Sequence, residues 1–463
     1  MSDYDLIVRH ATLATPEGVR VADLAVSDGV IAAIDEDLSG TAAGELDAGA
    51  LHVLPGGIDP HVHFNEPGHA EWEGLDHGTR SLAAGGMTAF FDMPLNSVPS
   101  TVDGESFDRK LAAAQRSARV DFGLWGGLIP GRLDGLGELA ERGVVGIKAF
   151  MSSTHWTPFP AVDNVTLHDG MARCAQLGLL LAVHAESDQL TAGLTARARA
   201  EGRHSGRDWT DSRPPIAEIE AIGRAIAFAE DTGCALHVVH VSTGRGIELV
   251  AQARERGVDV SCESCAHHLA MTASELETSG TLAKCAPPLR EADEVERLWQ
   301  HLRSGALPMF VSDHSPCPPD RKQTSDFLDA WAGIAGCQST LPAALTEGHH
   351  ARGLALDLLA RALATNAADR FGLPRKGRLA VGADADLTLV DLDADEVVDA
   401  RSLHYRHPIS AWVGRRMRAR VVRTLLRGQT VFVDGEIVGA PAGRLIRPAI
   451  EPVPLTRSSR EDR

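Results

Sequence analysis

Eight strand-like apolar runs, separated by alanine-rich helical patterns, constrain the fold of this chain more than any other feature of its sequence. Strands that are apolar on nearly every residue are buried on both faces, which is typical of parallel sheets. Eight repeated strand and helix units predict an α/β fold of the TIM-barrel, or (β/α)8, kind. The runs span residues 53–64, 88–94, 120–127, 144–151, 179–186, 235–242, 258–267 and 307–315.

The two ends of the chain have a different, strand-rich character. Residues 1–52 and 376–440 contain short alternating segments with Gly and Asp turns, and Asp434-Gly435 is a hairpin signal. We therefore predict a small β-sandwich domain, made from both ends, beside a barrel domain of residues 53–375. Residues 441–463 are rich in proline and charge, and we expect a loosely held C-terminal tail.

Composition excludes several classes of partner. The 463 residues include 45 Lys and Arg against 63 Asp and Glu, a net charge of −18 that is poorly suited to nucleic acid. No apolar run approaches the length of a membrane span, and the acidic start of the chain lacks the basic segment of a signal peptide. Seven cysteines, an odd number, indicate reduced thiols rather than a disulfide framework. We expect a cytoplasmic protein that acts on a small molecule.

Polar residues gather at the predicted C-terminal ends of the strands, where TIM barrels build their active sites. His61 and His63 end the first run two residues apart, so both side chains point to the same face of the strand. Four later runs end near further candidates, namely Lys148, His184, His240 and Asp313. Imidazole and carboxylate ligands favour a borderline cation, with zinc first and manganese, cobalt or iron as alternatives.

Lys148 is the unusual member of this group, because a protonated amine cannot ligate a metal. Burial near cations can remove the proton. The neutral amine could then react with carbon dioxide to give a carbamate, a carboxylate that bridges two metals. The alternative is an ordinary ion pair of Lys148 with Asp313 or Glu186, and the sequence leaves both readings open.

A second cluster of metal-type residues comprises Cys262, Cys265, His267 and His268, and it resembles part of a zinc-deaminase signature. That signature has a proline before its first cysteine, where this chain has Ser261. The two cysteines also lie three apart in a predicted strand, so their side chains face opposite ways. We expect both cysteines, and His267, to be packing residues.

The chain as a whole resembles the amidohydrolase superfamily, in the cyclic amidohydrolase branch of dihydroorotases, hydantoinases, dihydropyrimidinases and allantoinases. The likeness runs from "GGIDPHVHF" to "KGRLAVGADADLTLVDLD". It implies a homo-oligomer, dimer or tetramer, with two divalent metal ions per chain. It also implies residue roles: one metal on His61 and His63, the other on His184 and His240, carboxylated Lys148 as bridge, and Asp313 as ligand and general base.

Departures within the branch bear on the substrate. Dihydroorotases carry Arg where this chain has Asn65, so the bidentate grip on a substrate carboxylate is missing. Hydantoinases and dihydropyrimidinases usually carry Tyr five residues after the carboxylated lysine, where this chain has Ser153. The segments "HVHFNEPGHAEWEG", "DMPLNSVPST", "SDHSPCPP" and "WAGIAGCQ" resemble allantoinases.

This resemblance implies metal-dependent hydrolysis of a neutral cyclic ureide, allantoin, to allantoate. The first alternative is a hydantoinase-like hydrolase of other cyclic amides. A dihydroorotase or a non-catalytic scaffold protein agrees less well with these residues. Candidate substrate contacts are Asn65, Asn96, Ser315 and the backbone around Cys285 and around residues 333–336. The amide of Asn65 can donate and accept hydrogen bonds, although Asn65 is also suited to the turn that follows it. The segment "EWEG" and residues 152–164 are candidates for a lid.

Overall fold

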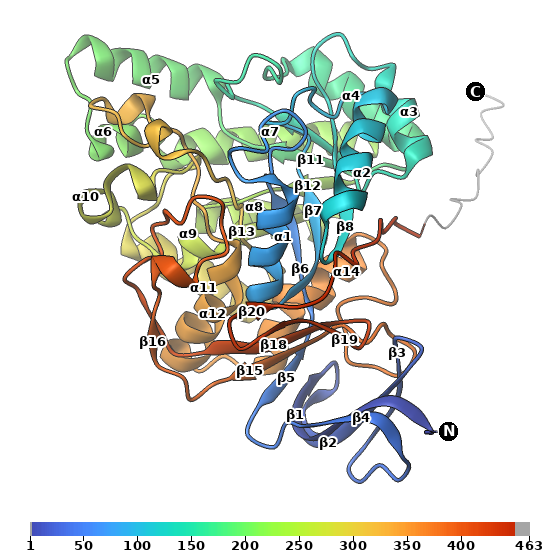
Figure 1. The fold of residues 1–463 in the computed structure, drawn as a ribbon. Coiled ribbons are helices and arrows are strands. Elements are labelled where there is room, and N and C mark those ends of the chain that lie inside the picture. Colours follow the sequence, from blue (N-terminus) through green and yellow to red (C-terminus); the bar gives the residue numbers. More distant parts are fainter. Residues whose placement is uncertain (1, 450–463) are drawn as a thin grey trace, which may run out of the picture.

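The computed structural model describes residues 2–449, and parallel strands occupy the upper part of the molecule in Figure 1. These strands pair in chain order as two sheets, the first of β6–β8 and the second of β9–β14. A parallel bridge between Val62 and His314 joins the outer strands of the two sheets. The strands are β6 (Gly57–Val62), β7 (Met87–Asp92), β8 (Asp121–Leu124), β9 (Gly126–Gly127), β10 (Ile147–Phe150), β11 (Leu181–His184), β12 (Leu236–Val238), β13 (Val260–Cys265) and β14 (Met309–Val311).

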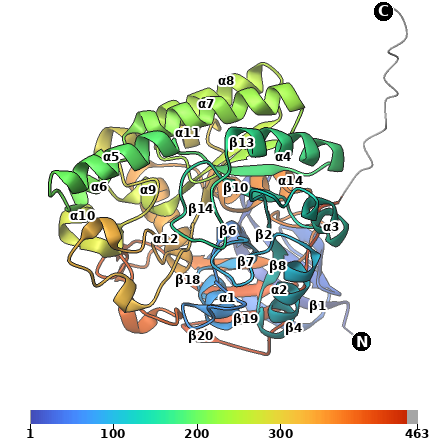
Figure 2. The same cartoon turned by 90° about the horizontal axis from the view of Figure 1, so that it is seen from above.

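Helices surround the parallel strands, as the view from above in Figure 2 shows, and the α/β class predicted from the sequence is confirmed. The expected helix end at Gly233 is also found, because Gly233 caps its helix in the left-handed conformation with φ 70°. The longer helices are α1 (Gly74–Ala84), α2 (Gly104–Ser117), α3 (Gly135–Arg142), α4 (Asn164–Leu177), α5 (Asp188–Ala200), α7 (Pro215–Thr232), α8 (Gly244–Glu255) and α11 (Ala292–Ser304). The shorter ones are α6 (Gly206–Asp211), α9 (Ala266–Ala270), α10 (Glu275–Thr278), α12 (Thr340–Ala343), α13 (Leu356–Ala360) and α14 (Asn366–Arg370).

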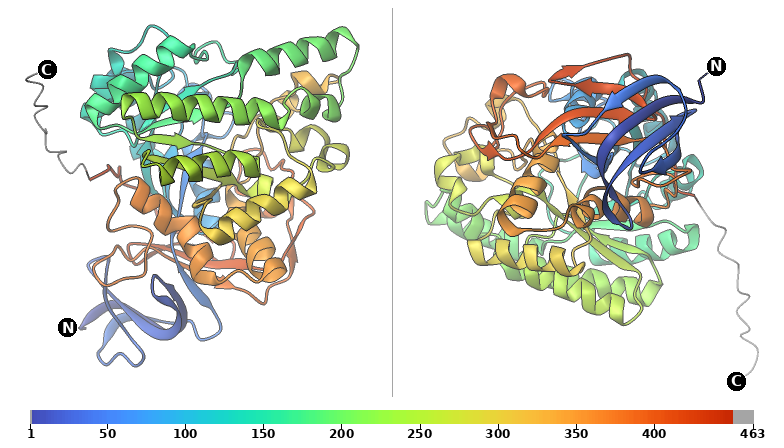
Figure 3. Two further views of the ribbon diagram at one scale, coloured as in Figure 1. Left: turned by 180° about the vertical axis from the view of Figure 1, so that it is seen from behind. Right: turned by 90° about the horizontal axis from the view of Figure 1, so that it is seen from below.

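Strands from both ends of the chain form one nine-stranded sheet, and Figure 3 shows them side by side from below. The hairpin between its last two strands turns at Asp434 and Gly435, with φ 47° and 91°, as the sequence predicts. The strands are β1 (Tyr4–Thr15), β2 (Gly18–Ser27), β3 (Val30–Asp35), β4 (Ala42–Asp47), β5 (His52–Pro55), β15 (Leu387–Asp391), β18 (Arg420–Leu426), β19 (Gln429–Val433) and β20 (Glu436–Ile437). A separate pair consists of β16 (Glu396–Val397) and β17 (Arg416–Met417).

The first apolar run of the sequence is divided between the two sheet systems. Its start, β5, pairs with β1 and β15 in the nine-stranded sheet, while its end, β6, pairs with β7. The change falls at Gly56 and Gly57, where the chain passes close to its neighbours. A Cβ atom on Gly56 would lie 2.2 Å from the Thr88 hydroxyl, and one on Gly57 would lie 2.2 Å from the Met87 sulfur. Glycine is therefore required at this crossing.

An apolar cluster supports the strands that carry the candidate site. Phe91, Trp125 and Phe371 pack edge to face, with ring centroids 4.8 and 5.5 Å apart, and all three are buried. The indole of Trp125 donates a hydrogen bond to the carbonyl of Pro60, 2.9 Å away, just before His61. This packing holds the end of β6 in a defined position.

The last described residues lie along β8. The carbonyl of Phe122 accepts a hydrogen bond from the backbone N–H of Ile446 at 2.8 Å, and the N–H of Phe122 donates to the carbonyl of Arg444 at 2.9 Å. Residues 450–463 of the predicted tail lie outside the described residues. Among the helices of residues 2–449, none combines the length and apolar character needed to cross a membrane.

Candidate metal centre

Three of the candidate ligands, His61, His63 and Asp313, form what we call the first half of the centre. A carboxylate oxygen of Asp313 lies 3.2 Å from Nε2 of His61 and 3.3 Å from Nε2 of His63. All three side chains are buried, and their donor atoms lie within 4.8 Å of one another, close enough to share one ion. Burial alone would raise the pKa of Asp313, but the two imidazoles outweigh it and hold that pKa well below its usual range.

His184 and His240 form the second half. Nδ1 of His184 lies 3.0 Å from Nε2 of His240, and the rings are 4.7 Å apart. Burial lowers the pKa of both imidazoles, so both are neutral at pH 7 and have a nitrogen lone pair available. The two halves are adjacent, because the rings of His61 and His240 lie 5.4 Å apart.

Lys148 lies fully buried in β10, and its amine has no hydrogen-bond partner among the described residues. Burial lowers its pKa to about 7, despite the opposing charges of Glu263 and Asp313. The alternative pairing with Glu186 is not formed, since Glu186 is taken by His184 and Arg213 at 2.8 and 2.6 Å. An unpaired buried amine of this kind can lose its proton near neutral pH.

The donor set therefore fits divalent metal ions. It combines four imidazoles, one carboxylate and one neutralisable amine, at the ends of strands β6, β10, β11, β12 and β14. Buried atoms without a partner mark the same place, namely Nδ1 of His63, Nζ of Lys148 and Nδ1 of His240. The structure thus brings all six sequence-predicted metal ligands together.

Two glutamates that the sequence reasoning did not assign as ligand partners orient imidazoles in the two halves. Glu263 lies 2.5 Å from Nδ1 of His61 and 3.1 Å from His237, while Glu186 lies 2.8 Å from Nε2 of His184. Each carboxylate accepts a hydrogen bond from the N–H of one ring nitrogen and so leaves the opposite nitrogen free for a metal. Burial opposes ionisation, but Arg213 and His184 lower the pKa of Glu186 to about 2, and His61 and His237 lower that of Glu263 to about 2.

Backbone strain is concentrated at the strand ends of the centre. His240 and Asp313 have positive φ angles of 40° and 44°, a region that residues other than glycine rarely adopt. Both residues follow their strands by two positions. Such strain persists only where the surrounding structure holds it, and it is common at functional sites.

A cavity of about 90 Å³ opens beside both halves. Of the predicted substrate contacts, Asn96 and Ser315 line it, whereas Asn65 and Cys285 do not. Ala286, in the segment around Cys285, also lines the cavity. Asn65 is buried with φ 64° and donates to the carbonyl of Pro316 at 3.4 Å, as suits a turn residue. The carbonyl of Cys285 accepts from the indole of Trp209 at 2.9 Å.

Several residues that line this cavity were not singled out from the sequence. They are Leu95, Phe150, Trp209, Arg213, Trp331 and Ala332. Thr154 and His155, which also line the cavity, belong to the predicted lid segment 152–164. Arg213 packs on the ring of Trp209, 4.2 Å from its centroid, and its Nε has no partner among the described residues. An aromatic residue four positions before an arginine is too common a pattern to have been found without the tertiary structure.

The two segments proposed as a lid contact one another. Trp72 of the "EWEG" segment lies 6.1 Å from Trp156 of the second segment, measured between ring centroids. Trp72 also packs edge to face on Trp331, a residue that lines the cavity, at 4.9 Å. Trp72 thus connects the second segment to the wall of the cavity.

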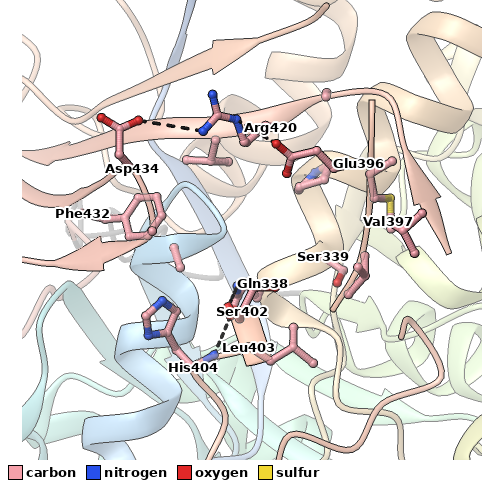
Figure 4. Close-up of a pocket in the computed structure, with 17 residues that line it drawn as sticks. Gln338, Ser339, Glu396, Val397, Ser402, Leu403, His404, Arg420, Phe432 and Asp434 are labelled. Carbon is pink, nitrogen blue, oxygen red and sulfur yellow. Dashed lines mark hydrogen bonds and ion pairs between the residues drawn. The ribbon is translucent and has the colours of Figure 1, made fainter. Parts of the chain in front are cut away.

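A larger cavity of about 270 Å³ lies elsewhere, between the nine-stranded sheet and the helices (Figure 4). Arg420 projects from β18 there between Glu396 and Asp434, at 3.3 and 3.9 Å. Neither group of residues suited to a metal within the described chain lies in this cavity. One of these groups, that of His61, His63 and Asp313, lines the smaller cavity instead.

Comparison with known proteins agrees with this geometry. The profile of the amidohydrolase family matches residues 52–431. This chain belongs to the amidohydrolase family, and the predicted membership of this superfamily is confirmed.

Individual members of the family that resemble this chain show which branch of the family it is most similar to. The chain is 56% identical to an allantoinase of Rubrobacter xylanophilus, over 97% of this chain and 99% of that protein. It is 49% identical to an allantoinase of Deinococcus radiodurans, over 96% and 99%. Among solved structures, L-hydantoinase from Arthrobacter aurescens superposes with a TM-score of 0.93 at 34% identity, over 96% of this chain and 100% of that one. The resemblance to allantoinases drawn from the sequence is thus confirmed.

Proposed function

We propose that this chain is a metal-dependent cyclic amidohydrolase that hydrolyses allantoin to allantoate. The observation that carries the proposal is the convergence of His61, His63 and Asp313 with His184, His240 and an unpaired Lys148 at one cavity. The identity of 41–56% to proteins named allantoinase supports the choice of substrate. We propose the (β/α)8 barrel, with a β-sandwich from the chain ends, as the scaffold.

The metal ions are assigned to the two halves, with zinc as the first choice. His61 and His63 would hold one ion and His184 and His240 the other, and Asp313 would be a further ligand. When bound, the ions supply a Lewis acid for the substrate carbonyl and a water of lowered pKa. Glu263 and Glu186 keep the ring nitrogens of His61 and His184 turned toward these ions.

Lys148 would join the halves as a carbamate. Its neutral amine attacks the carbon of carbon dioxide, a nitrogen–carbon bond forms, and one proton is released to solvent. The pKa of about 7 makes the neutral amine available near neutral pH. The product is a carboxylate on a long side chain, which can offer one oxygen to each half.

Asp313 moves the proton of the reaction. Its carboxylate, ionised at neutral pH, takes a proton from the attacking water. Water oxygen bonds to the ring carbonyl carbon, the carbon–nitrogen bond breaks, and the leaving nitrogen receives the proton held by Asp313. A carboxylate and a terminal ureido group result. Asn96 and Ser315 are positioned to hydrogen-bond the neutral ring, and Trp331 covers it.

A substrate panel tests this function. Purified, metal-loaded protein is assayed with allantoin, hydantoin, dihydrouracil and dihydroorotate, and bound metal is measured on the same sample. Allantoin is expected to give the highest kcat/KM. Cleavage of hydantoin without cleavage of allantoin would refute the proposal. Protein that binds no transition metal after incubation with an excess of metal would refute the metal assignment.

A second candidate is hydrolysis of hydantoins or dihydropyrimidines. The superposition with a solved L-hydantoinase favours it. The same panel separates the two candidates, because they predict opposite orders of kcat/KM for allantoin and hydantoin.

We further propose a cytoplasmic homo-oligomer, a dimer or tetramer. The seven cysteines are all free and buried, which suits a reducing compartment. Light scattering of the purified protein tests the oligomeric state, and a monomeric mass would contradict it.

A further inference from the structure

We propose that Cys265, His267 and His268 form a separate site for a soft or borderline divalent cation, and that a cation there inhibits the enzyme. One donor atom from each of these three side chains lies within 4.8 Å of the other two. All three side chains are buried, with 2% exposure or less. We call this group the thiol site.

The thiol site contains only one of the two cysteines of the "CESC" segment. Cys265 shares a strand face with Glu263, two positions earlier, and Glu263 points to His61 of the metal centre. Cys262 lies on the opposite face, where its sulfur is 3.9 Å from the carbonyl of Ala306. The strand alternation expected from the sequence is therefore present, but it turns Cys265 toward two histidines.

The two imidazoles have unpaired nitrogen atoms. Nε2 of His268 lies 3.1 Å from the carbonyl of Pro287 and must carry the proton, because a carbonyl only accepts. Nδ1 of the same neutral ring is then a lone-pair donor, and it is buried without a partner. Nε2 of His267 is also buried without a partner. Unpaired buried polar atoms are costly, and a ligand that accepts their lone pairs satisfies both.

The donor set determines the class of ligand. One thiolate and two imidazoles suit zinc or cadmium, and they suit hard cations such as magnesium poorly. Binding exchanges ligands without oxidation: the sulfur–hydrogen bond of Cys265 breaks, its proton passes to solvent, and a sulfur–metal bond forms. The metal centre itself contains no thiol, which separates the two sites chemically.

The expected consequence is inhibition, and this part rests on the proposed function. Cys265 lies two positions from Glu263 on the same strand face, and Glu263 orients His61 of the metal centre. A cation in the thiol site attracts this carboxylate and weakens its hold on His61. Metal beyond the two catalytic equivalents is therefore expected to lower turnover.

Cadmium provides the test, because cadmium bound to thiolate has a charge-transfer band in the ultraviolet. Metal-loaded protein is titrated with Cd²⁺, and the band, the bound equivalents and allantoin turnover are followed together. Wild-type protein is expected to gain the band with one equivalent beyond the catalytic pair and to lose turnover in parallel. Equilibration is expected to be slow because the site is buried.

Two variants and a matched control identify the site. Cys265→Ala should lose the band and resist inhibition, and His268→Gln should shift the titration to higher Cd²⁺. Cys262→Ala, on the opposite face of the same strand, should behave as wild type. Retention of two catalytic equivalents verifies that each variant is folded.

The outcomes are separable. A band that persists in Cys265→Ala, from thiols elsewhere in the chain, overturns the site, as does the absence of a band in wild type. Equal inhibition of wild type and Cys265→Ala overturns the inhibitory role. A normal band with no allantoin turnover in any sample leaves the thiol site standing and refutes the proposed function instead.

Discussion

The two halves of the candidate metal centre both contain imidazoles at strand ends, but the glutamates that orient these imidazoles have different hydrogen-bond partners. In the first half, Glu263 lies 3.1 Å from Nε2 of His237, and Nδ1 of His237 lies 2.7 Å from the hydroxyl of Ser261. All of these side chains are buried. In the second half, Glu186 is paired with Arg213, a residue that lines the substrate cavity.

The difference separates two tasks. A closed network can hold a metal ligand in place but has no contact with a bound molecule. A carboxylate shared with a cavity residue connects ligand orientation to whatever occupies the cavity. We therefore expect changes behind the first half to affect metal affinity, and changes behind the second half to affect metal affinity and KM together.

Lys148→Ala is expected to have the largest effect, because a bridging carbamate serves both halves at once. Activity should fall by more than about 100-fold, beyond the 10–100-fold typical of outer partners, and both metals should be lost on dialysis. Short carboxylic acids should restore part of the activity by replacing the carbamate. Metal content and turnover, with and without added acetate, are the measurements. Loss of one metal alone would contradict a bridge.

Glu263→Gln should affect the first half only. A glutamine amide has only one acceptor oxygen, so it cannot accept hydrogen bonds on two oxygens, from Nδ1 of His61 and from Nε2 of His237, as the carboxylate does. Metal affinity should therefore fall by about 10–100-fold, with one equivalent lost. Metal retained after dialysis against a weak chelator measures this. Ser261→Ala, at the far end of the same network, is the control and should retain both equivalents. We expect an unchanged KM at saturating metal. A raised KM would show that changes behind the first half also affect substrate binding, as changes behind the second half do.

Glu186→Gln should affect the second half and the cavity together. It removes the charge that pairs with Arg213, so the guanidinium is free to move within the cavity. We expect metal affinity to fall about tenfold, at the lower end of the range for residues that hydrogen-bond to metal ligands. We also expect a raised KM for allantoin. Steady-state kinetics at saturating metal gives the KM. Identical behaviour of the two glutamine variants would show that the halves do not differ.

The smallest expected effect concerns the stability of the metal-free protein at low pH. The pKa of Glu186 is lowered to about 2 from an ordinary 4.5, so its ion pair contributes stability that is present above pH 4.5 and is lost as the pH falls toward 2. The Tm advantage of wild type over Glu186→Gln should therefore shrink between pH 5 and pH 3. A constant difference across this range, measured by calorimetry, would contradict the ion-pair contribution.

The sequence was most informative where a side chain's role depends on its nearest neighbours. The spacing of His61 and His63 places both rings on one face by the period of the strand alone. The ends of the other runs contain the remaining candidate ligands, and the helix end at Gly233 follows from local backbone chemistry. It was least informative for substrate contacts, since Asn65 is turned to Pro316 while Arg213 and Trp331 line the cavity.

By itself, the sequence determined the α/β class, the family and the set of metal-type residues, because these are encoded by short-range periodicity and by residue identity. Only the tertiary structure decided which buried groups meet. Glu263 reaches His61 across 202 positions of chain, and Cys265 meets His267 and His268 through the turn into α9. Such contacts depend on how strands far apart in the chain pack beside one another, and no local pattern records that packing.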